Sequence, residues 1–426
     1  MHSENILTIV YIIPYYRLRG ALAYVLRKLI KGVQEYFRKY KIKIVIIAQG
    51  EHEKTKHDNI FKSKRDDVIL YIAGRGMISR FVRKLEFVNL LRGLMRILLP
   101  YKNPLILHAF FIYPSGLAAV IFAALNSIFS MSGLCKNKTI ITIGGDDVEY
   151  VPSIKYGRCL DPLIKLFTIS TLFMAKIIVA PSDYASSCIK SLAPFNGISC
   201  KVLKIPYGIE PTDYVCGEKE RSIPCRCIKG FKKSSEPQAF ILSLCRLHPK
   251  KGLIYLLYAF KVVREIFRQY NLKLLIAGEG SQYPYLRGLV RKLELTNDVI
   301  FLGYVTKEEK ISLLTNCLVY VLPSLSDVFA LSLIEAVACE AVAIVTLNVG
   351  SVYYLLRYNY PQELIVKPKD LASLVKAMIY AIENYESLKK KIKSIRDRAS
   401  VMLSTDYMIR AYATLYEIML RNCFHD

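Results

Sequence analysis

The sequence predicts an α/β protein built from two Rossmann-like, doubly wound domains in tandem. Short runs rich in β-branched residues alternate with longer helical stretches, and this alternation occurs twice along the 426 residues. Strands and helices in alternation favour parallel sheets covered by helices on both faces. We therefore expect an interdomain cleft, with ligands bound beyond the carboxyl ends of the strands.

The predicted strands are short apolar runs of the kind that a buried parallel sheet requires. In the first half they are ILTIVYII, KIVIIA, VILYI, LILHAFF, TIITIG and KIIVAPS. In the second half they are AFILSL, LKLLIAG, DVIFLG, CLVYVLPS and AVAIVTL. From about residue 368 the sequence has helical spacing to its end.

The domain boundary is predicted from a polar, irregular stretch, TDYVCGEKERSIPCRCIKGFKKSSEP, at residues 212–237. Such stretches usually separate compact domains. We expect an N-terminal domain at 1–205, a linker at 206–236, a C-terminal domain at 237–402 and a closing helix at 403–426.

Composition limits the classes of partner and compartment. The formal charge of +25 favours anionic partners, but the sequence has no RNA-reading module, and we expect no nucleic-acid binding. The eleven cysteines include no C-x-x-C pair, which indicates a reducing compartment and no zinc site.

Two segments raise the question of membrane insertion. The N-terminal run MHSENILTIVYIIPYY lacks a basic region and stops at Pro14, so we expect a first strand and no signal peptide. Residues 103–135 carry no charged side chain, but prolines and a glycine interrupt them. A buried strand followed by a helix from about Ser115 to Phe129 is one interpretation, and a membrane span or partial insertion is the other.

A basic amphipathic helix is expected within RFVRKLEFVNLLRGLMRILLPYK, residues 80–102. This helix could lie against an anionic membrane, or it could pack on the core with a solvated basic face. The first helix adds further cations to the same domain: Arg27, Lys28, Lys31, Arg38 and Lys39.

Two cations follow the first strand of the second domain. Arg246 and Lys251 stand between the strand AFILSL and the helix that begins near Leu253. Cations beside a helix N-terminus make an anion site. This segment, RLHPKKG, resembles the donor-diphosphate motif of GT-B glycosyltransferases of family 4, which are retaining and metal-independent. The resemblance implies that Arg246 and Lys251 hold the nucleotide diphosphate and stabilise it as it leaves.

Further segments resemble the same family in the same order. The Gly-x-Gly turn at Gly278 and Gly280 follows the strand LKLLIAG, and Val305 lies in the stretch that resembles the base-binding segment. The last helix resembles the closing helix that returns to the first domain in this fold.

The stretch DVFALSLIE, residues 327–335, resembles the family's pair of acids separated by seven residues. The resemblance implies that Asp327, in a loop, faces the transferred sugar, and that Glu335, on the following helix, binds the ribose hydroxyls. Carboxylates suit this role because they accept charge-assisted hydrogen bonds. The donor-binding set then also includes the residues between them, Phe329, Ala330 and Leu331.

The sequence departs from the family pattern at several places. Asp327 replaces a glutamate, and Ala330 and Glu340 replace glycines. Ser351 and Tyr354 stand at a usual glycine and a usual acid.

The first domain resembles the acceptor side of the family. Arg19 and Gly20 stand at the loop where a glycine pair is common, and TIGGDDVEYVP resembles the region usually written H-G-S-D. The resemblance places Gly145 and Asp147 in the cleft wall, with Gly144 at the position of the usual histidine.

The resemblance implies a glycosyltransferase that uses a nucleotide-sugar and no metal or other cofactor. We expect a glycan or polyprenyl-linked acceptor, and a cytoplasmic protein bound peripherally to the inner membrane face. Two alternatives stay open: a non-catalytic subunit that binds a partner glycosyltransferase or lipid-linked glycan, and a sugar-nucleotide epimerase.

Overall fold

In the computed structural model the chain forms two compact units. The first comprises Met1–Pro206 together with Thr405–Asp426, and the second comprises Tyr207–Ser404. The structure describes residues 7–14, 21–38, 42–49, 60–65, 68–73, 86–99, 105–129, 138–194, 196–199, 201–214 and 239–424.

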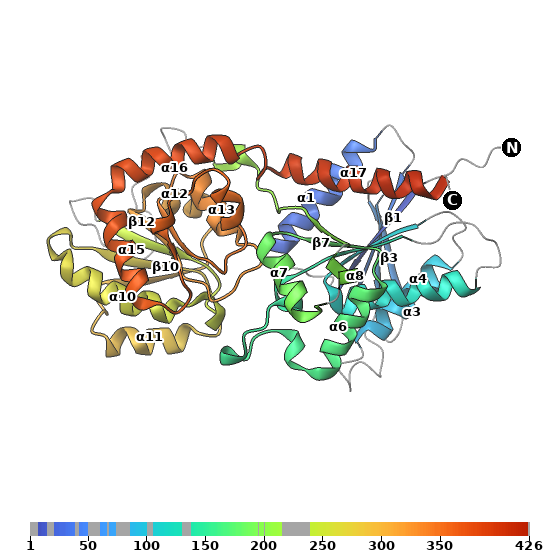
Figure 1. Ribbon diagram of the computed structural model, residues 1–426, viewed down its shortest axis with the longest axis horizontal. Coiled ribbons are helices and arrows are strands. Elements are labelled where there is room, and N and C mark those ends of the chain that lie inside the picture. Colours follow the sequence, from blue (N-terminus) through green and yellow to red (C-terminus); the bar gives the residue numbers. More distant parts are fainter. Residues whose placement is uncertain are drawn as a thin grey trace. The chain divides into compact units, whose positions relative to one another are not determined.

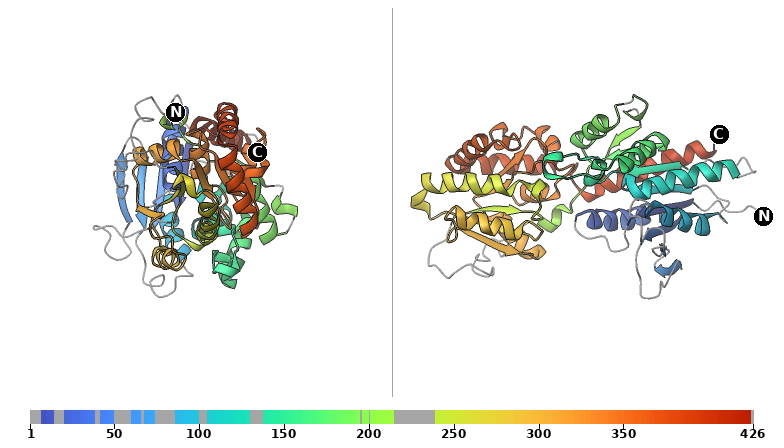
Figure 2. Two further views of the ribbon diagram at one scale, coloured as in Figure 1. Left: turned by 90° about the vertical axis from the view of Figure 1, so that its left-hand side faces the viewer. Right: turned by 90° about the horizontal axis from the view of Figure 1, so that it is seen from below.

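Each unit contains one sheet with helices on both faces (Figures 1 and 2). In spatial order the first sheet has β3 (Ile60–Arg65), β4 (Val68–Ala73), β2 (Ile42–Gln49), β1 (Leu7–Ile13), β5 (Leu105–Phe110), β6 (Lys138–Thr142), β7 (Ile177–Ala180) and β8 (Val202–Lys204). The second has β11 (Val299–Gly303), β10 (Lys273–Ala277), β9 (Phe240–Leu244), β12 (Val319–Leu322), β13 (Ala343–Thr346) and β14 (Ile365–Val366). The predicted α/β class with two Rossmann-like domains is confirmed.

Neighbouring strands pair in parallel, except that β3 runs antiparallel to β4. Three strands that the sequence did not predict, β3, β8 and β14, all lie at sheet edges. An edge strand pairs on one side only, so it can be short or charged without disturbing the core.

The helices of the first unit are α1 (Ala21–Tyr36), α3 (Glu86–Leu98), α4 (Leu117–Phe129), α5 (Gly145–Val148), α6 (Pro162–Met174), α7 (Asp183–Leu192), α8 (Asn196–Ser199) and α17 (Thr405–Phe424). Helix α1 packs against α17 on one face of the sheet, and α3 packs against α4, with α6 beside α4, on the other (Figure 1).

The helices of the second unit are α10 (Leu253–Ile266), α11 (Tyr283–Lys292), α12 (Lys307–Asn316), α13 (Leu331–Ala338), α14 (Val352–Leu356), α15 (Leu371–Glu383) and α16 (Tyr385–Ala399). Helix α10 packs with α11 and α15, and α13 packs with α12 and α16 (Figure 1). Of the predicted linker 206–236, Pro206 belongs to the first unit and residues 207–214 belong to this one, whereas residues 215–236 lie outside the described residues.

The apolar stretch at 103–135 contributes the buried strand β5 and the helix α4, which begins at Leu117. A π-helical turn, Ile112–Gly116, lies between them. Within the part of the chain that the structure describes, no helix has both the length and the apolar character needed to cross a bilayer.

Helix α3 is the described part of the predicted basic helix. Its buried apolar side chains, Leu90, Leu94, Ile97 and Leu98, belong to the core of the first unit, where they pack with strands β1, β2 and β5 and helix α4. Arg92 and Arg96 are exposed. This apolar face of α3 therefore packs on the core, as one of the two sequence interpretations expected.

A buried polar network connects α17 to the first sheet. His108 on β5 contacts the Tyr416 hydroxyl through Nδ1, at 2.6 Å, and the Thr142 hydroxyl through Nε2, at 2.8 Å. The Tyr412 hydroxyl lies 2.9 Å from Thr142 Oγ1, and Tyr416 donates to the Tyr11 hydroxyl at 3.2 Å. Burial lowers the pKa of His108 from 6.5 to about 3, so the imidazole is neutral at physiological pH.

We expect this histidine to make the fold sensitive to acid. Between pH 6.5 and about 3 the unfolded chain binds a proton at His108 that the folded chain does not, so the free energy of unfolding falls as pH is lowered. The contribution of one such group is at most roughly 1.4 kcal/mol per pH unit. Urea denaturation at several pH values measures it.

His108→Gln should weaken this pH dependence, because the variant has no titrating group at the site. His248→Gln is the comparison variant: partial burial and the neighbouring Lys250 also lower the pKa of His248, so this variant should lose a smaller part of the pH dependence than His108→Gln. An unchanged pH slope in His108→Gln would contradict the assignment.

Candidate functional site

The predicted donor residues of the second unit follow the carboxyl ends of neighbouring strands of its sheet, a side of the sheet that is called its carboxyl edge below. Arg246 and Lys251 follow β9, and Asp327 follows β12, while Glu335 lies on α13. Because β9 and β12 are parallel neighbours, their carboxyl ends meet at the same edge.

The loop that carries Arg246 is held by the Gly278–Gly280 turn. The amide of Cys245 donates to the carbonyl of Ala277 at 3.0 Å, and that of Leu247 donates to the carbonyl of Glu279 at 2.8 Å. Gly278 has φ of +127°, and a Cβ there would lie 2.0 Å from the carbonyl oxygen of Cys245. The two glycines thus allow the turn to pack against the loop, which leaves the Arg246 side chain exposed.

The next residues bring Lys251 to Asp327. Gly252 has φ of +65°, and a Cβ there would lie 2.1 Å from the carbonyl oxygen of Pro323. The amide of Leu325 donates to the carbonyl of Lys250 at 2.6 Å. With the two loops in this contact, Lys251 Nζ forms an ion pair with Asp327 Oδ2, and both side chains are nearly buried.

The backbone of Asp327 is fixed on its other side. Its amide donates to the carbonyl of Asn348, and its carbonyl accepts from the amide of Gly350, both at 2.8 Å. Burial alone would raise the pKa of Asp327, but the charges of Lys251 and Lys250 and hydrogen bonds from Lys251 and the Phe329 amide outweigh it. The pKa therefore lies below its ordinary value, and the carboxylate is ionised at neutral pH.

Glu335 has two partners that the sequence analysis did not identify. Its Oε1 accepts from the Tyr214 hydroxyl at 2.7 Å and from Lys310 Nζ at 2.6 Å. These contacts join residues 121 and 25 positions apart, so no local pattern predicts them. The available signal is a pair of lysines three residues apart, Lys307 and Lys310, at the start of a helix after the predicted base-binding segment.

One buried hydroxyl lies near both acids. Burial raises the pKa of Tyr320 well above its ordinary value, and the nearby Cys245, Glu335 and Asp327 add to the effect. The two carboxylates belong to successive segments of the second unit, the loop after β12 and the helix α13.

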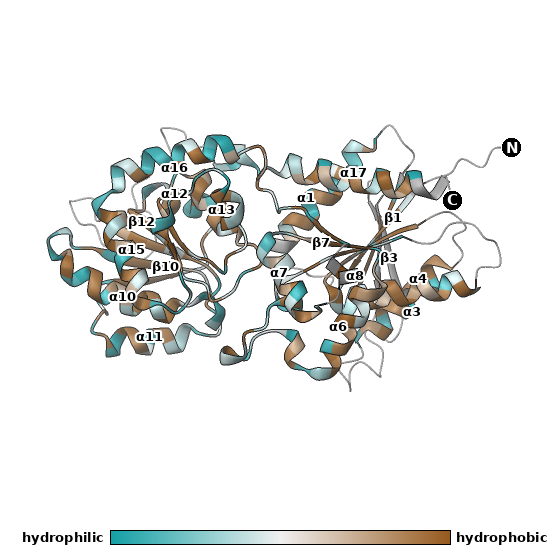
Figure 3. Cartoon of the chain, viewed as in Figure 1, coloured by the Kyte–Doolittle hydropathy of each residue, from teal (hydrophilic) through white to brown (hydrophobic). Residues whose placement is uncertain are grey.

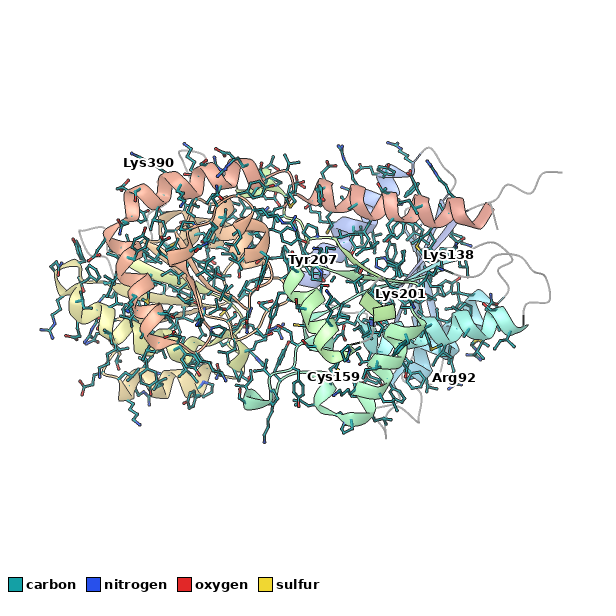
Figure 4. The ribbon with its side chains drawn as sticks, viewed as in Figure 1. Arg92, Lys138, Cys159, Lys201, Tyr207 and Lys390 are labelled. Carbon is teal, nitrogen blue, oxygen red and sulfur yellow. The ribbon has the colours of Figure 1, made fainter. Side chains whose placement is uncertain are left out.

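Most of the residues between the two acids are buried and packed against neighbouring segments. The Phe329 ring lies edge-to-face with Tyr207, at 5.4 Å between centroids, and with Tyr354, at 6.0 Å (Tyr207 is labelled in Figure 4). The carbonyl of Ala330 accepts from Ser351 Oγ at 3.1 Å, and Leu331 begins α13. Val305 is half-buried, directly before the N-cap residue of α12.

In the first unit, Asp147 holds two loops together from a buried position. Its Oδ2 accepts from the amides of Ile112, at 3.0 Å, and Gly144, at 2.9 Å. Burial and the neighbouring Asp146 raise the pKa of Asp147 to about 7, although Arg158 and the two amides oppose the shift. Gly145 begins α5.

Arg19 and Gly20 lie outside the described residues. Across the described ranges, no group of three or more His, Cys, Asp or Glu side chains lies close enough together to hold a metal ion.

Known proteins resemble this chain in sequence and in fold. An uncharacterised glycosyltransferase of Methanocaldococcus jannaschii is 26% identical over 227 residues, which cover 53% of this chain and 56% of that protein. O-antigen chain mannosyltransferase C of Escherichia coli is 27% identical over 287 residues, which cover 67% and 70% of the two chains. The chain thus matches little more than half the length of the first relative.

Solved structures match over nearly the whole chain. Sucrose-phosphate synthase from Thermosynechococcus elongatus superposes with a TM-score of 0.74 at 15% identity and covers 97% of this chain and 100% of its own. Anabaena HepE in complex with UDP and glucose superposes with a TM-score of 0.67 at 13% identity, over 96% and 99% of the two chains. These likenesses establish the fold.

The family model described as glycosyl transferases group 1 matches residues 228–398. This range includes each of the four charged residues at the carboxyl edge, Arg246, Lys251, Asp327 and Glu335. Residues 228–398 therefore match the glycosyl transferases group 1 family, and the chain has the GT-B fold.

Proposed function

We propose that the protein is a glycosyltransferase that transfers a sugar from a nucleoside-diphosphate sugar to a glycan or polyprenyl-linked acceptor. The observation that carries this proposal is the set of opposite charges at the carboxyl edge: Arg246, the Lys251–Asp327 ion pair and Glu335. The set lies inside the segment that matches the group 1 family.

The donor would bind through its charges. A departing diphosphate gains negative charge, which the cations Arg246 and Lys251 would stabilise. That no metal ion takes part is proposed from the family resemblance. Asp327, which is ionised, would accept hydrogen bonds from sugar hydroxyls, and Glu335 would accept them from the ribose. Transfer with retention of configuration is part of the proposal because the family resemblance implies it.

The relatives support these ligand classes. HepE has been solved with UDP and glucose, which is consistent with a nucleoside-diphosphate donor. The name of O-antigen chain mannosyltransferase C is consistent with a glycan acceptor.

One observation favours the second candidate, a non-catalytic subunit that binds a partner glycosyltransferase or a lipid-linked glycan. Gly144 stands where the resemblance expects a histidine, and a Cβ there would lie 2.3 Å from the Phe111 ring. The ring therefore occupies the space that a side chain at position 144 would need. Donor binding and turnover separate the two candidates.

We also propose that the first unit docks on the cytoplasmic face of an anionic membrane. Helix α6 exposes Leu163, Leu166, Phe173 and Met174, and its one charged residue is Lys165. Figure 3 shows α6 largely in hydrophobic colours, in contrast to α16. The exposed Arg92 of α3, labelled in Figure 4, adds a cation on the sheet face that α6 also covers.

The first prediction from the proposed function concerns the donor site. Arg246→Ala should weaken binding of the nucleoside-diphosphate sugar by about 10- to 100-fold, because a hydrogen bond to a charged group is worth about 1.5–3 kcal/mol. Calorimetric titration with UDP-, GDP- and ADP-sugars measures it, followed by transfer assays with the sugar that binds.

Arg287→Ala is the matched control, because it removes the same charge from an exposed position on α11. If well-folded protein bound none of these sugars, the donor site would be refuted. Binding without turnover on any glycan or polyprenyl-linked acceptor would favour the non-catalytic subunit.

The second prediction concerns the membrane. The protein should co-sediment with vesicles that contain phosphatidylglycerol and much less with pure phosphatidylcholine, and added salt should release it. Lys165→Glu should weaken binding by at least about fivefold, because each cation near such a surface contributes about 1 kcal/mol.

Lys390→Glu makes the same charge change on the exposed face of α16, at the position labelled in Figure 4, and should bind like the wild type. Equal loss in both variants would show an effect of net charge alone and would refute α6 as the docking face.

A further inference from the structure

We infer that Lys310 is a positioning residue for the donor: together with Tyr214 it orients the Glu335 carboxylate toward the ribose hydroxyls of the nucleotide. The inference rests on the proposed function, since it assigns the group that prepares one of the proposed donor contacts. Lys310 lies on α12 and Glu335 lies on α13. Tyr214 is the last residue of the 3-10 turn Pro211–Tyr214.

The two oxygens of the Glu335 carboxylate have different surroundings. Oε1 accepts from both Lys310 Nζ, at 2.6 Å, and the Tyr214 hydroxyl, at 2.7 Å. No group in the described ranges donates to Oε2. One oxygen is therefore held by the protein, and the other keeps its acceptor capacity for a ligand hydroxyl.

The Glu335 carboxylate needs a cation beside it because it is largely buried. The side chains of Glu335 and Lys310 are only 13% and 19% exposed. A carboxylate largely removed from water is unfavourable without a charged or hydrogen-bonding partner. Lys310 supplies the opposite charge, and two donors on one oxygen restrict rotation of the carboxylate, as supporting residues do around a binding site.

A second lysine on the same helix offers a natural comparison. Lys307 Nζ pairs with Asp213 at 2.8 Å, while Lys310 Nζ lies 5.4 Å from the centroid of the Tyr214 ring. Both lysines therefore contact the short 3-10 turn Pro211–Tyr214. Of the two, Lys310 alone also contacts Glu335 in the described structure, so loss of Lys307 tests the packing of this turn and loss of Lys310 tests the carboxylate as well.

This division predicts an energetic coupling between Lys310 and the ribose. If Lys310 orients Glu335, removing a ribose hydroxyl from the donor should reduce the affinity of the wild type strongly. The same removal should reduce the affinity of a Lys310 variant much less. A residue that only stabilises the fold would lower the affinity for both nucleotides by the same factor.

The experiment is a calorimetric titration of the full chain with the nucleoside diphosphate that the wild type binds and with its 2′-deoxy and 3′-deoxy forms. Lys310→Met should weaken binding of the ribonucleotide by about tenfold and bring the ribo-to-deoxy affinity ratio close to one. Lys307→Met should keep the wild-type ratio, and Lys310→Arg should restore part of it. Thermal denaturation establishes that each variant is folded.

Tyr214→Phe provides a second test that does not depend on the stability of Lys310→Met. It removes one donor to Oε1 and keeps the ring and the lysine, so the affinity ratio should fall between those of the wild type and Lys310→Met. An unchanged ratio in both Tyr214→Phe and Lys310→Met would overturn the inference and leave the proposed donor site intact. A wild type that binds no nucleoside diphosphate would overturn the proposed function, and the inference with it.

Discussion

The Lys251–Asp327 ion pair is the interaction on which the arrangement of the candidate site depends. It joins the loop after β9 to the loop after β12, and each loop is fixed by backbone hydrogen bonds to a further segment. A pair this deeply buried is favourable only when its geometry is held in place. The same logic explains three acids in the apolar stretch 317–345: each pairs with a cation from another element, Lys251 for Asp327, Lys310 for Glu335 and Arg396 for Glu340.

The places where the sequence departs from the family are compensated locally. Ser351 and Tyr354, at a usual glycine and a usual acid, contact Ala330 and Phe329, which lie between Asp327 and α13. Glu340 replaces a glycine and still has the left-handed φ of 60°, which costs a non-glycine residue about 1–2 kcal/mol. Its carboxylate pairs with Arg396 of α16, which offsets part of that cost.

Sequence alone could predict the parts of this molecule that depend on local pattern. The central strands are buried on both faces, so their apolar runs stand out, whereas β3 carries Lys62, Lys64 and Arg65 at a sheet edge and shows no such run. The elements that carry Arg246, Lys251, Asp327 and Glu335 were predicted, because each residue lies in the loop after a clear strand or on a clear helix. Tyr214 and Lys310 were not, because their contacts to Glu335 depend on how distant segments pack.

The acids of the two units illustrate how the nearest charge determines what a buried carboxylate can do. Asp327 faces lysines, its pKa is lowered, and it stays an anion able to accept hydrogen bonds from a polar ligand. Burial, and then the neighbouring Asp146, raise the pKa of Asp147 to about 7 against the opposing charge of Arg158, so near neutral pH it loses its charge easily. Since the unfolded value is 3.8, the folded state binds the extra proton, and ionisation of Asp147 destabilises the first unit as pH rises through this range. Asp147 therefore fits the part of a residue that holds the Ile112 and Gly144 loops in position, whereas Asp327 keeps a negative charge at neutral pH, as the proposed contact with a sugar donor would need.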